Sequence, residues 1–237
     1  MRVRDLYVHP VKGCRAVAVD AAAFGPLGLE HDRRFAFVGP DGLALTQRDQ
    51  PLLATIRPSI DKDSIRLDFG GLDEATIGFD AFAQPARVDV WGNPVPGHAA
   101  PLDLVAQATS YLGTPVRLVM LARESQRAFV DSRPVLVTTT ESLARLGLPE
   151  TGMERFRPNV VLEGAEGWAS LEGEDVLLER DKPCGRCEVT TIDQTSGARR
   201  GPEPLRTLNE RFGGNFGYYY RVARPGRVRR GEPLKAA

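Results

Sequence analysis

The sequence predicts a mainly β protein, built from β-barrels, with a few short α-helices. The 24 glycines and 18 prolines are spread along all 237 residues, and such frequent turn-forming residues suit many short strands joined by tight turns. Most apolar runs are short and rich in β-branched residues, whereas few segments show helical spacing. The first ~95 residues are therefore expected to form an all-β unit, either a barrel or a sandwich.

The N-terminal half is expected to alternate strands and turns. Val3, Leu6 and Val8 alternate loosely and predict a strand over residues 2–9, followed by a tight turn over residues 11–15. Residues 92–97 contain two glycines and two prolines, which predict a loop. Further strands are expected at residues 16–23, 35–38, 43–46, 54–58, 64–69, 76–82 and 86–91.

The C-terminal half is expected to mix strands with short helices. Residues 102–112 carry apolar residues at helical spacing and stop at Gly113. A second helix should follow the N-cap cluster at residues 139–142 and end near Gly147, and a third should span residues 204–212. Strands are expected at residues 116–121, 134–138, 160–162, 175–180, 188–192, 218–222 and 227–228, with residues 123–133 irregular.

Composition limits the class of protein. Hydrophobic residues make up 42% of the chain, and the 31 basic residues balance the 31 acidic ones. This balance gives no indication of a nucleic-acid or membrane-surface binder. The N-terminus shows no secretory signal, no apolar run approaches the ~20 residues of a membrane span, and three cysteines make no disulfide framework. We expect a cytoplasmic protein with reduced thiols.

Cys184 and Cys187 form a C-x-x-C pair with Arg186 between them. A neighbouring cation favours the thiolate, which is the form that binds metals or attacks electrophiles. The β-branched run at residues 188–192 predicts a strand, so the cysteines should lie on a turn or strand edge and not at the start of a helix, which disfavours a thioredoxin-type dithiol. A structural zinc site is disfavoured because no second close pair exists, the other candidates being His9, Cys14, His31 and His98. An accidental pair and one special cysteine with a neighbour remain equally good interpretations.

Several cations sit at turns or strand ends. Each by itself is best interpreted as a solvated surface charge, but rigid turns are also where a fold positions charges for a ligand. If they converge, they would form an anion site, most plausibly for a phosphate. These cations are Lys12, Arg33, Arg48, Arg157 and Arg186. The two tryptophans, Trp91 and Trp168, are expected in core packing.

Six motifs in order along the chain resemble a known family, the MOSC-domain proteins with an N-terminal MOSC β-barrel. This family includes the YcbX-like reductases and the mitochondrial amidoxime-reducing component. The motifs cover nearly the whole chain. They are YVHPVKGCR (7–15), GLEHDRRF (28–35), TQRDQP (46–51), RFRPNVV (155–161), PCGRCEVTTID (183–193) and NFGYY (215–219).

The resemblance implies an N-terminal MOSC β-barrel domain over residues 1–115 and a MOSC domain over residues 116–237. It also implies a molybdenum cofactor, which is a pterin dithiolene with a terminal phosphate, and assigns the molybdenum ligand to Cys187. In the family pattern Lys12 and Arg33 resemble the phosphate clamp, and Arg157 and Asn159 resemble residues that line the pterin. The remaining positions that the resemblance assigns to the cofactor are Gly13, Ser132, Arg133, Gly185 and Tyr219.

The activity that the resemblance implies is reduction of N-hydroxylated compounds by oxygen-atom transfer at a cysteine-ligated molybdenum. An iron–sulfur cluster needs four cysteines, so electrons are expected from a separate ferredoxin- or flavoprotein-type protein. The alternative is a non-redox carrier of a persulfide on Cys187 or of the cofactor itself. Two departures from the family pattern stand out: Gly13 replaces a common serine, and the segment 120–133 is shortened, which should reshape the substrate entrance.

Overall fold

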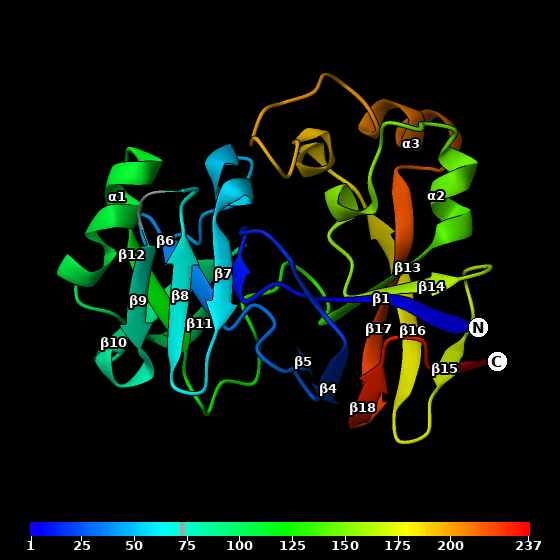
Figure 1. The fold of residues 1–237 in the computed structure, drawn as a ribbon, viewed down its shortest axis with the longest axis horizontal. Helices are drawn as coiled ribbons and strands as arrows, with labels where there is room; N and C mark the ends of the chain where they lie inside the picture. The colour runs from blue at the N-terminus through cyan, green and yellow to red at the C-terminus, as the bar shows by residue number, and fades with distance from the viewer. Residues whose placement is uncertain (72–73) are drawn as a thin grey trace.

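The computed structural model describes residues 1–71 and 74–237, and they form two β-rich lobes that lie side by side (Figure 1). The α-helices in this part of the chain are short, at seven residues each. They are α1 (Ala106–Leu112), α2 (Thr140–Leu146) and α3 (Leu205–Arg211). The prediction of a mainly β fold with a few short helices is confirmed.

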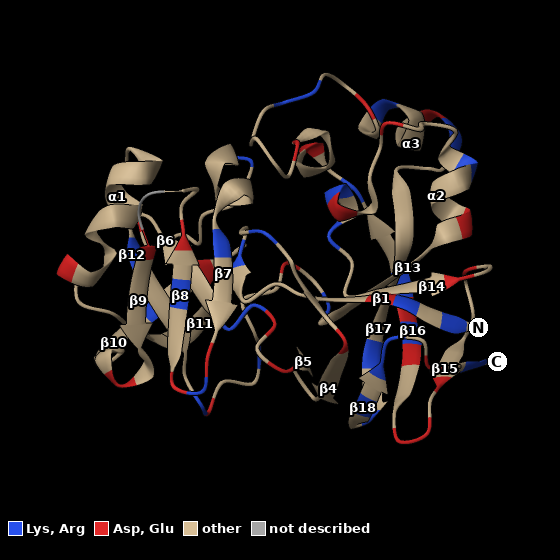
Figure 2. Cartoon of the chain, in the orientation of Figure 1, with Lys and Arg blue, Asp and Glu red and all other residues tan. Residues whose placement is uncertain are grey.

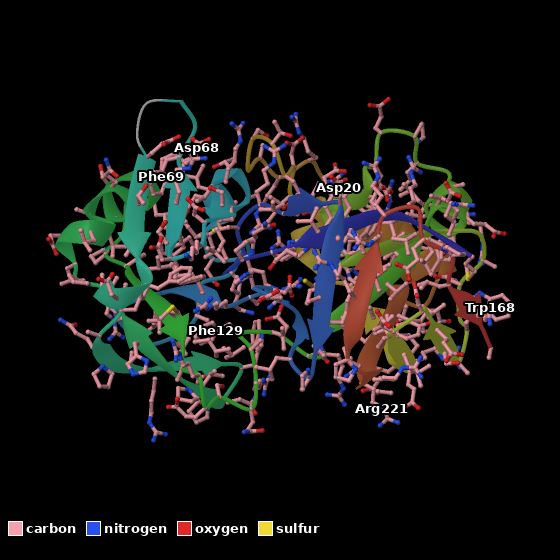
Figure 3. All side chains as sticks on the ribbon, turned by 60° about the horizontal axis from the view of Figure 1, so that its bottom comes forward. Asp20, Asp68, Phe69, Phe129, Trp168 and Arg221 are labelled. Atoms are coloured by element: carbon pink, nitrogen blue, oxygen red, sulfur yellow. The ribbon has the colours of Figure 1, made fainter. Side chains whose placement is uncertain are left out.

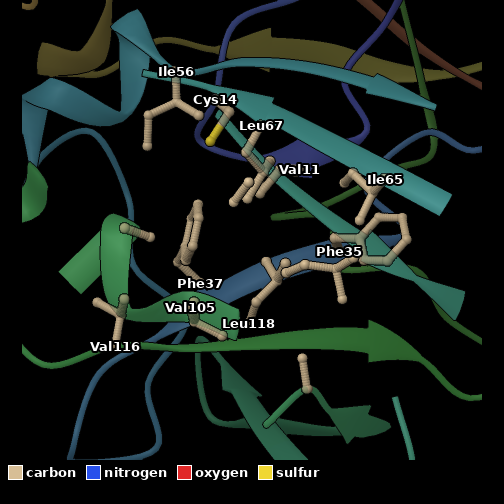
Figure 4. Packing of buried hydrophobic residues seen from close by; sticks show 14 of the residues in the cluster. Val11, Cys14, Phe35, Phe37, Ile56, Ile65, Leu67, Val105, Val116 and Leu118 are labelled. Carbon is tan, nitrogen blue, oxygen red and sulfur yellow. The ribbon is translucent and has the colours of Figure 1, made fainter. Parts of the chain in front are cut away.

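The first lobe is built on a five-stranded sheet and a separate three-stranded sheet. The larger sheet has the order β10 (Gln84–Val90), β11 (Asn93–Ala99), β12 (Arg117–Leu121), β6 (Phe35–Val38), β2 (Val11–Lys12). The smaller sheet contains β7 (Arg57–Ile60), β8 (Ser64–Asp68) and β9 (Glu74–Gly78). Phe35, Phe37 and Leu118 are fully buried in the core that joins these elements (Figure 4).

The second lobe is built on an eight-stranded sheet that includes the first strand of the chain. β1 (Arg2–Val8) pairs with β14 (Val160–Glu163) and β3 (Val17–Val19), so the N-terminus belongs to this lobe (Figure 1). The sheet order is β19 (Lys235–Ala236), β15 (Ser170–Glu172), β16 (Leu177–Gly185), β17 (Asn215–Arg224), β13 (Val135–Thr139), β14 (Val160–Glu163), β1, β3 (Val17–Val19). A small sheet of β18 (Gly226–Arg229), β4 (Ala21–Gly25) and β5 (Gly28–Leu29) completes the lobe.

Most expected elements are found within a few residues of their predicted bounds, with several exceptions in the first half of the chain. The segment 43–46 forms only isolated bridges at Leu43 and Ala44, and the segment 76–82 is divided between β9 and a 3-10 helix (Phe79–Ala81). The segment 54–58 is not one strand, because a 3-10 helix (Pro51–Thr55) precedes β7. The segment 16–23 splits into β3 and β4. The predicted loop at 92–97 is strand β11 instead. Pro94 and Pro96 fit this strand because they pair only with β10, and β12 begins pairing at Gly97.

The segment after the C-x-x-C pair is also not the predicted strand. Residues Glu188–Thr191 form a 3-10 helix (Figure 1). Cys187 is its N-cap residue, so the expectation that the cysteines avoid a helix start is wrong for Cys187. The β-branched threonines favoured a strand, but their hydroxyl groups instead bond to the carbonyl groups of Cys187 and Glu188 within the helical turn.

The tryptophans are not core residues, contrary to the prediction. Trp91 is 54% exposed and Trp168 is 39% exposed, and Figure 3 shows Trp168 at the outer edge of the second lobe. Trp91 and Gly92 both have positive φ, at 57° and 76°. They form the two-residue turn between β10 and β11, which places the Trp91 ring outside the sheet.

Candidate functional site

A cavity of about 360 Å³ is lined by loops from both halves of the sequence. It brings together every residue that the sequence analysis assigned to a cofactor. These are Lys12, Gly13, Arg33, Ser132, Arg133, Arg157, Asn159, Gly185, Cys187 and Tyr219. Their convergence is a fact of the fold, while their binding of a cofactor stays a prediction.

The lining is strongly basic. Seven cationic side chains border the cavity, and the only carboxylate among the described lining residues belongs to Asp131. Figure 2 shows Lys and Arg segments on the loops where the two lobes meet. The cations are Lys12, Arg33, Arg48, Arg133, Arg157, Lys182 and Arg186. An excess of this kind within a concave site favours an anionic ligand.

Lys12 and Gly13 lie where β2 ends. Lys12 is 5% exposed and forms an ion pair with Asp131. Burial lowers the pKa of Lys12, while the Asp131 charge opposes that effect. Gly13 has a φ of 81°, and a Cβ atom there would lie 2.9 Å from Leu53 Cδ1. A left-handed backbone favours glycine at this position, and a Cβ atom would also displace the end of the Leu53 side chain.

Asp131 is held from a second side by Trp91. The Trp91 Nε1–H donates to Asp131 Oδ1 at 2.8 Å, and the Arg48 guanidinium lies 4.6 Å from the Trp91 ring centroid. Although burial opposes ionisation, the charge of Lys12 and its hydrogen bond lower the pKa of Asp131 to about 2. Trp91 therefore links the Lys12–Asp131 pair to Arg48 at the edge of the cavity.

Arg33 belongs to a buried polar network behind the cavity. Its guanidinium forms an ion pair with Asp32 and also donates to Asn159 Oδ1 at 3.3 Å. Asp32 Oδ1 accepts hydrogen bonds from Asn159 Nδ2 and from the His9 backbone N–H, at 3.0 and 2.8 Å. His9 is fully buried and its Nε2 contacts the Pro158 carbonyl at 3.1 Å. This network fixes both Arg33 and the loop that carries Arg157.

Arg157 is a cavity cation without an ion-paired carboxylate among the described residues. It follows a 3-10 helix (Met153–Phe156) at a φ of 54°, a strained conformation for an arginine. Among the described residues no carboxylate forms an ion pair with it, and its Nη1 donates to the neutral Gln194 Oε1 at 3.3 Å. Burial and the nearby Arg33 lower the pKa of Arg157 to about 10. The guanidinium still carries its charge at neutral pH and can bind an anion.

Cys187 is the only one of the three cysteines that is not buried. It lies between β16 and the 3-10 helix and borders the cavity. The Arg48 side chain contacts Cys187. Burial alone would lower the pKa of Arg48, but the contact with Cys187 raises it. A partly exposed thiol beside a guanidinium can bind a soft metal as the thiolate.

Cys184 has a different environment. It is 1% exposed, and Arg186 Nη1 donates to its Sγ at 2.8 Å while Nη2 donates to the Phe156 carbonyl at 2.7 Å. The Arg186 Nε is buried without a hydrogen-bond partner. Burial and the neighbouring Cys184 raise the pKa of Tyr219, so its phenol stays protonated. The C-x-x-C pair thus consists of one thiol that borders the cavity, Cys187, and one buried thiol, Cys184.

Sequence reasoning missed several polar residues of the site. Asp131, Gln47 and Gln194 either border the cavity or bond to its lining. Asp131 lies beside the predicted Ser132, but nothing in the chain pattern pairs it with Lys12, which is 119 residues away. Among the predicted residues, Arg133 directs its side chain to an ion pair with Asp181 and is 45% exposed.

Two other kinds of feature are absent from the described residues. No cluster of three or more His, Cys, Asp or Glu side chains suited to a metal ion occurs among them. No helix in residues 1–71 and 74–237 is long and apolar enough to cross a membrane.

The chain belongs to the MOSC-domain proteins that carry an N-terminal MOSC beta barrel. Residues 1–115 match the MOSC N-terminal beta barrel domain, and residues 124–235 match the MOSC domain. The predicted division at residue 115 remains a prediction, because β1 of the first segment pairs with β14 of the second.

Among curated proteins, the chain is similar to mitochondrial amidoxime reducing component 2 of Bos taurus. The identity is 29% over 278 residues, which covers 98% of this chain and 82% of that protein. Mitochondrial amidoxime-reducing component 1 of Homo sapiens is 28% identical over 98% of this chain and 82% of its own length. The molybdenum cofactor sulfurase of Drosophila willistoni is 28% identical over 92% of this chain, but only 30% of that protein is covered.

Proposed function

We propose that the cavity binds a molybdenum cofactor and that the protein reduces N-hydroxylated compounds. The observation that carries the proposal is the convergence of a partly exposed thiol, Cys187, with seven cations in one cavity. A cofactor that joins a thiolate-binding metal to a pterin phosphate needs both features. The similarity to amidoxime-reducing components over nearly the whole chain supports the same activity.

The residues that line the cavity fit a molybdenum cofactor. Arg157 offers a guanidinium without a carboxylate partner among the described residues, as an anion ligand requires. Lys12 and Arg33 stand beside it, each fixed by one acidic residue, and their charges would hold the terminal phosphate. Asn159 is already committed to Asp32, Tyr7 and Leu136, so its role would be to shape the pterin side of the cavity.

Cys187 would hold and tune the metal through its thiolate, with Arg48 beside it to compensate the negative charge. When bound, the cofactor would supply the two electrons and the acceptor for the oxygen of an N–O bond. The net reaction converts R–NH–OH, two electrons and two protons into R–NH2 and water. Tyr219 borders the cavity and keeps its proton at Oη, beside Cys184.

The electrons would come from a separate electron-transfer protein. Only three cysteines are present, and an iron–sulfur cluster normally takes four. Two of the three are buried in the described structure. An internal iron–sulfur relay is therefore not available from these residues.

The test is the molybdenum and pterin content of protein made in a host that synthesises the cofactor. Wild type should carry near-stoichiometric metal, and Cys187→Ala should carry none. Cys14→Ala is the control and should match wild type, because Cys14 is buried in the hydrophobic core of the first lobe. The loaded wild type should reduce an N-hydroxylated amidine with an artificial electron donor. Equal metal in wild type and Cys187→Ala would refute the assignment of Cys187.

A second function is favoured by the similarity to a molybdenum cofactor sulfurase. In this alternative Cys187 carries a persulfide, or the cavity carries the cofactor for delivery to another enzyme. Mass spectrometry of the purified chain distinguishes the two functions. A mass increase of one sulfur on Cys187, without molybdenum and without reductase turnover, would favour the carrier.

A further inference from the structure

A buried pair of glutamine side chains joins the two halves of the cavity. Gln47 is 1% exposed and Gln194 is 5% exposed. Each amide donates to the other, from Gln47 Nε2 to Gln194 Oε1 and from Gln194 Nε2 to Gln47 Oε1, both at 2.9 Å. The two residues are 147 positions apart in the sequence. Such a reciprocal pair uses one donor and one acceptor of each side chain and fixes both amide planes.

The remaining bonds of this pair reach the cavity lining from both sides. Gln47 Nε2 also donates to the Gly13 carbonyl at 2.7 Å, next to Lys12. Gln194 Nε2 also donates to the Ile192 carbonyl at 3.2 Å, and Gln194 Oε1 accepts from Arg157 Nη1 at 3.3 Å. The pair therefore sets the position of the Lys12–Gly13 turn relative to the Arg157 guanidinium.

The acceptor that meets Arg157 is neutral. A buried guanidinium is usually paired with a carboxylate, as Arg33 is paired with Asp32. A carboxylate at the Gln194 position would compensate Arg157 internally and compete with any anionic ligand. An amide can orient the guanidinium while leaving its whole charge for the ligand.

We propose that the Gln47–Gln194 pair is a neutral clamp that positions Arg157 and the Lys12–Gly13 turn for an anionic ligand. Gln47 and Gln194 are positioning residues, because they act through Arg157 and Gly13 and do not need to touch the ligand. The inference rests on the proposed function only in taking the ligand of the cavity to be anionic. It gives Gln47 and Gln194, neither of which was predicted to bind the cofactor, an indirect role in the affinity for that anion.

The experiment uses the full chain from a host without the cofactor, with inorganic pyrophosphate as the probe and isothermal titration calorimetry as the readout. Gln194→Glu should weaken pyrophosphate binding about tenfold or more at pH 7. The new carboxylate would compensate Arg157, and the charge-assisted bond between Arg157 and pyrophosphate would be lost. Gln194→Met, which removes the bond without adding charge, should weaken binding only about threefold, because Arg157 keeps its charge and loses only the contact that orients it. Gln84→Glu, on exposed strand β10, is the matched control and should leave the affinity unchanged.

A difference between the Glu and Met variants is the result that a merely structural role would not produce. Equal loss in both, or no loss in Gln194→Met, would overturn the proposal. If Gln194→Glu does not fold, Gln194→Met decides the question alone: unchanged pyrophosphate affinity overturns the clamp. A wild type that takes up molybdenum but no pyrophosphate also overturns it and leaves the proposed function standing. A wild type that binds pyrophosphate but never molybdenum overturns the proposed function and leaves the clamp to be decided by the Gln194 variants.

Discussion

Replacing Arg157 by glycine should weaken the anion site and stabilise the fold at the same time. The residue has a φ of 54°, and a left-handed conformation costs an L-residue roughly 1–2 kcal/mol that glycine does not incur. Its pKa falls from 12.5 to about 10, and at about 1.4 kcal/mol for each unit of pKa the buried charge costs on the order of 3 kcal/mol.

The stabilising contributions that Arg157→Gly removes are smaller than these gains. Arg157 gives up one long hydrogen bond to Gln194 at 3.3 Å, worth about 1 kcal/mol, and glycine adds about 1 kcal/mol of chain entropy to the unfolded state. The net expectation for Arg157→Gly is about 2–3 kcal/mol of added stability, or roughly 4–12 °C in Tm for a chain of this size. Pyrophosphate binding should fall about tenfold or more.

Arg33→Gly is the matched control with the opposite sign. Arg33 has a similar φ, 47°, but its partner Asp32 has only 1% of its side chain exposed. Removing one member of a buried ion pair costs about 3–5 kcal/mol, more than the relief of strain. Differential scanning calorimetry of the two variants checks the reasoning. A lowered Tm in Arg157→Gly, or shifts of the same sign in both variants, would refute it.

Three further outcomes are expected. Burial, with Arg33 and Arg157 nearby, holds the pKa of His9 well below 6.5. His9 therefore does not reduce the free energy of unfolding above pH 6.5, but reduces it by up to ~1.4 kcal/mol per pH unit below that value. In His9→Gln this contribution to the pH dependence of Tm should disappear. Asp131→Asn should cost about 1–3 kcal/mol because buried Lys12 loses its counter-charge, and added pyrophosphate should restore part of the lost Tm; no restoration would argue against an anion at Lys12. Iodoacetamide should modify native protein once, at Cys187, because Cys14 and Cys184 are buried; two adducts without denaturant would contradict this burial.

Local sequence patterns identified most of the fold. Strands such as β1 and β6 carry apolar residues that match their buried faces, and Gly113 and Gly147 end α1 and α2 in the left-handed conformation that glycine favours. The failures occur where local preference is overridden by packing. The β-branched segment 188–191 forms a helical turn, and the proline-containing segment 93–99 becomes a strand.

The sequence by itself determined the family, the mainly β class and the residue types of the site. The family resemblance assigned ten positions to a cofactor, eight of them within the six motifs, and all ten border the cavity.

Only the tertiary structure decided which charges are compensated. Arg33, Arg157 and Lys12 are equivalent in the sequence, as cations at turns. In the fold, Arg33 meets Asp32, Lys12 meets Asp131 across 119 positions, and Arg157 meets the amide of Gln194. The physical reason is that compensation depends on distances of a few ångströms between side chains, and chain folding sets those distances between residues that are far apart in the sequence.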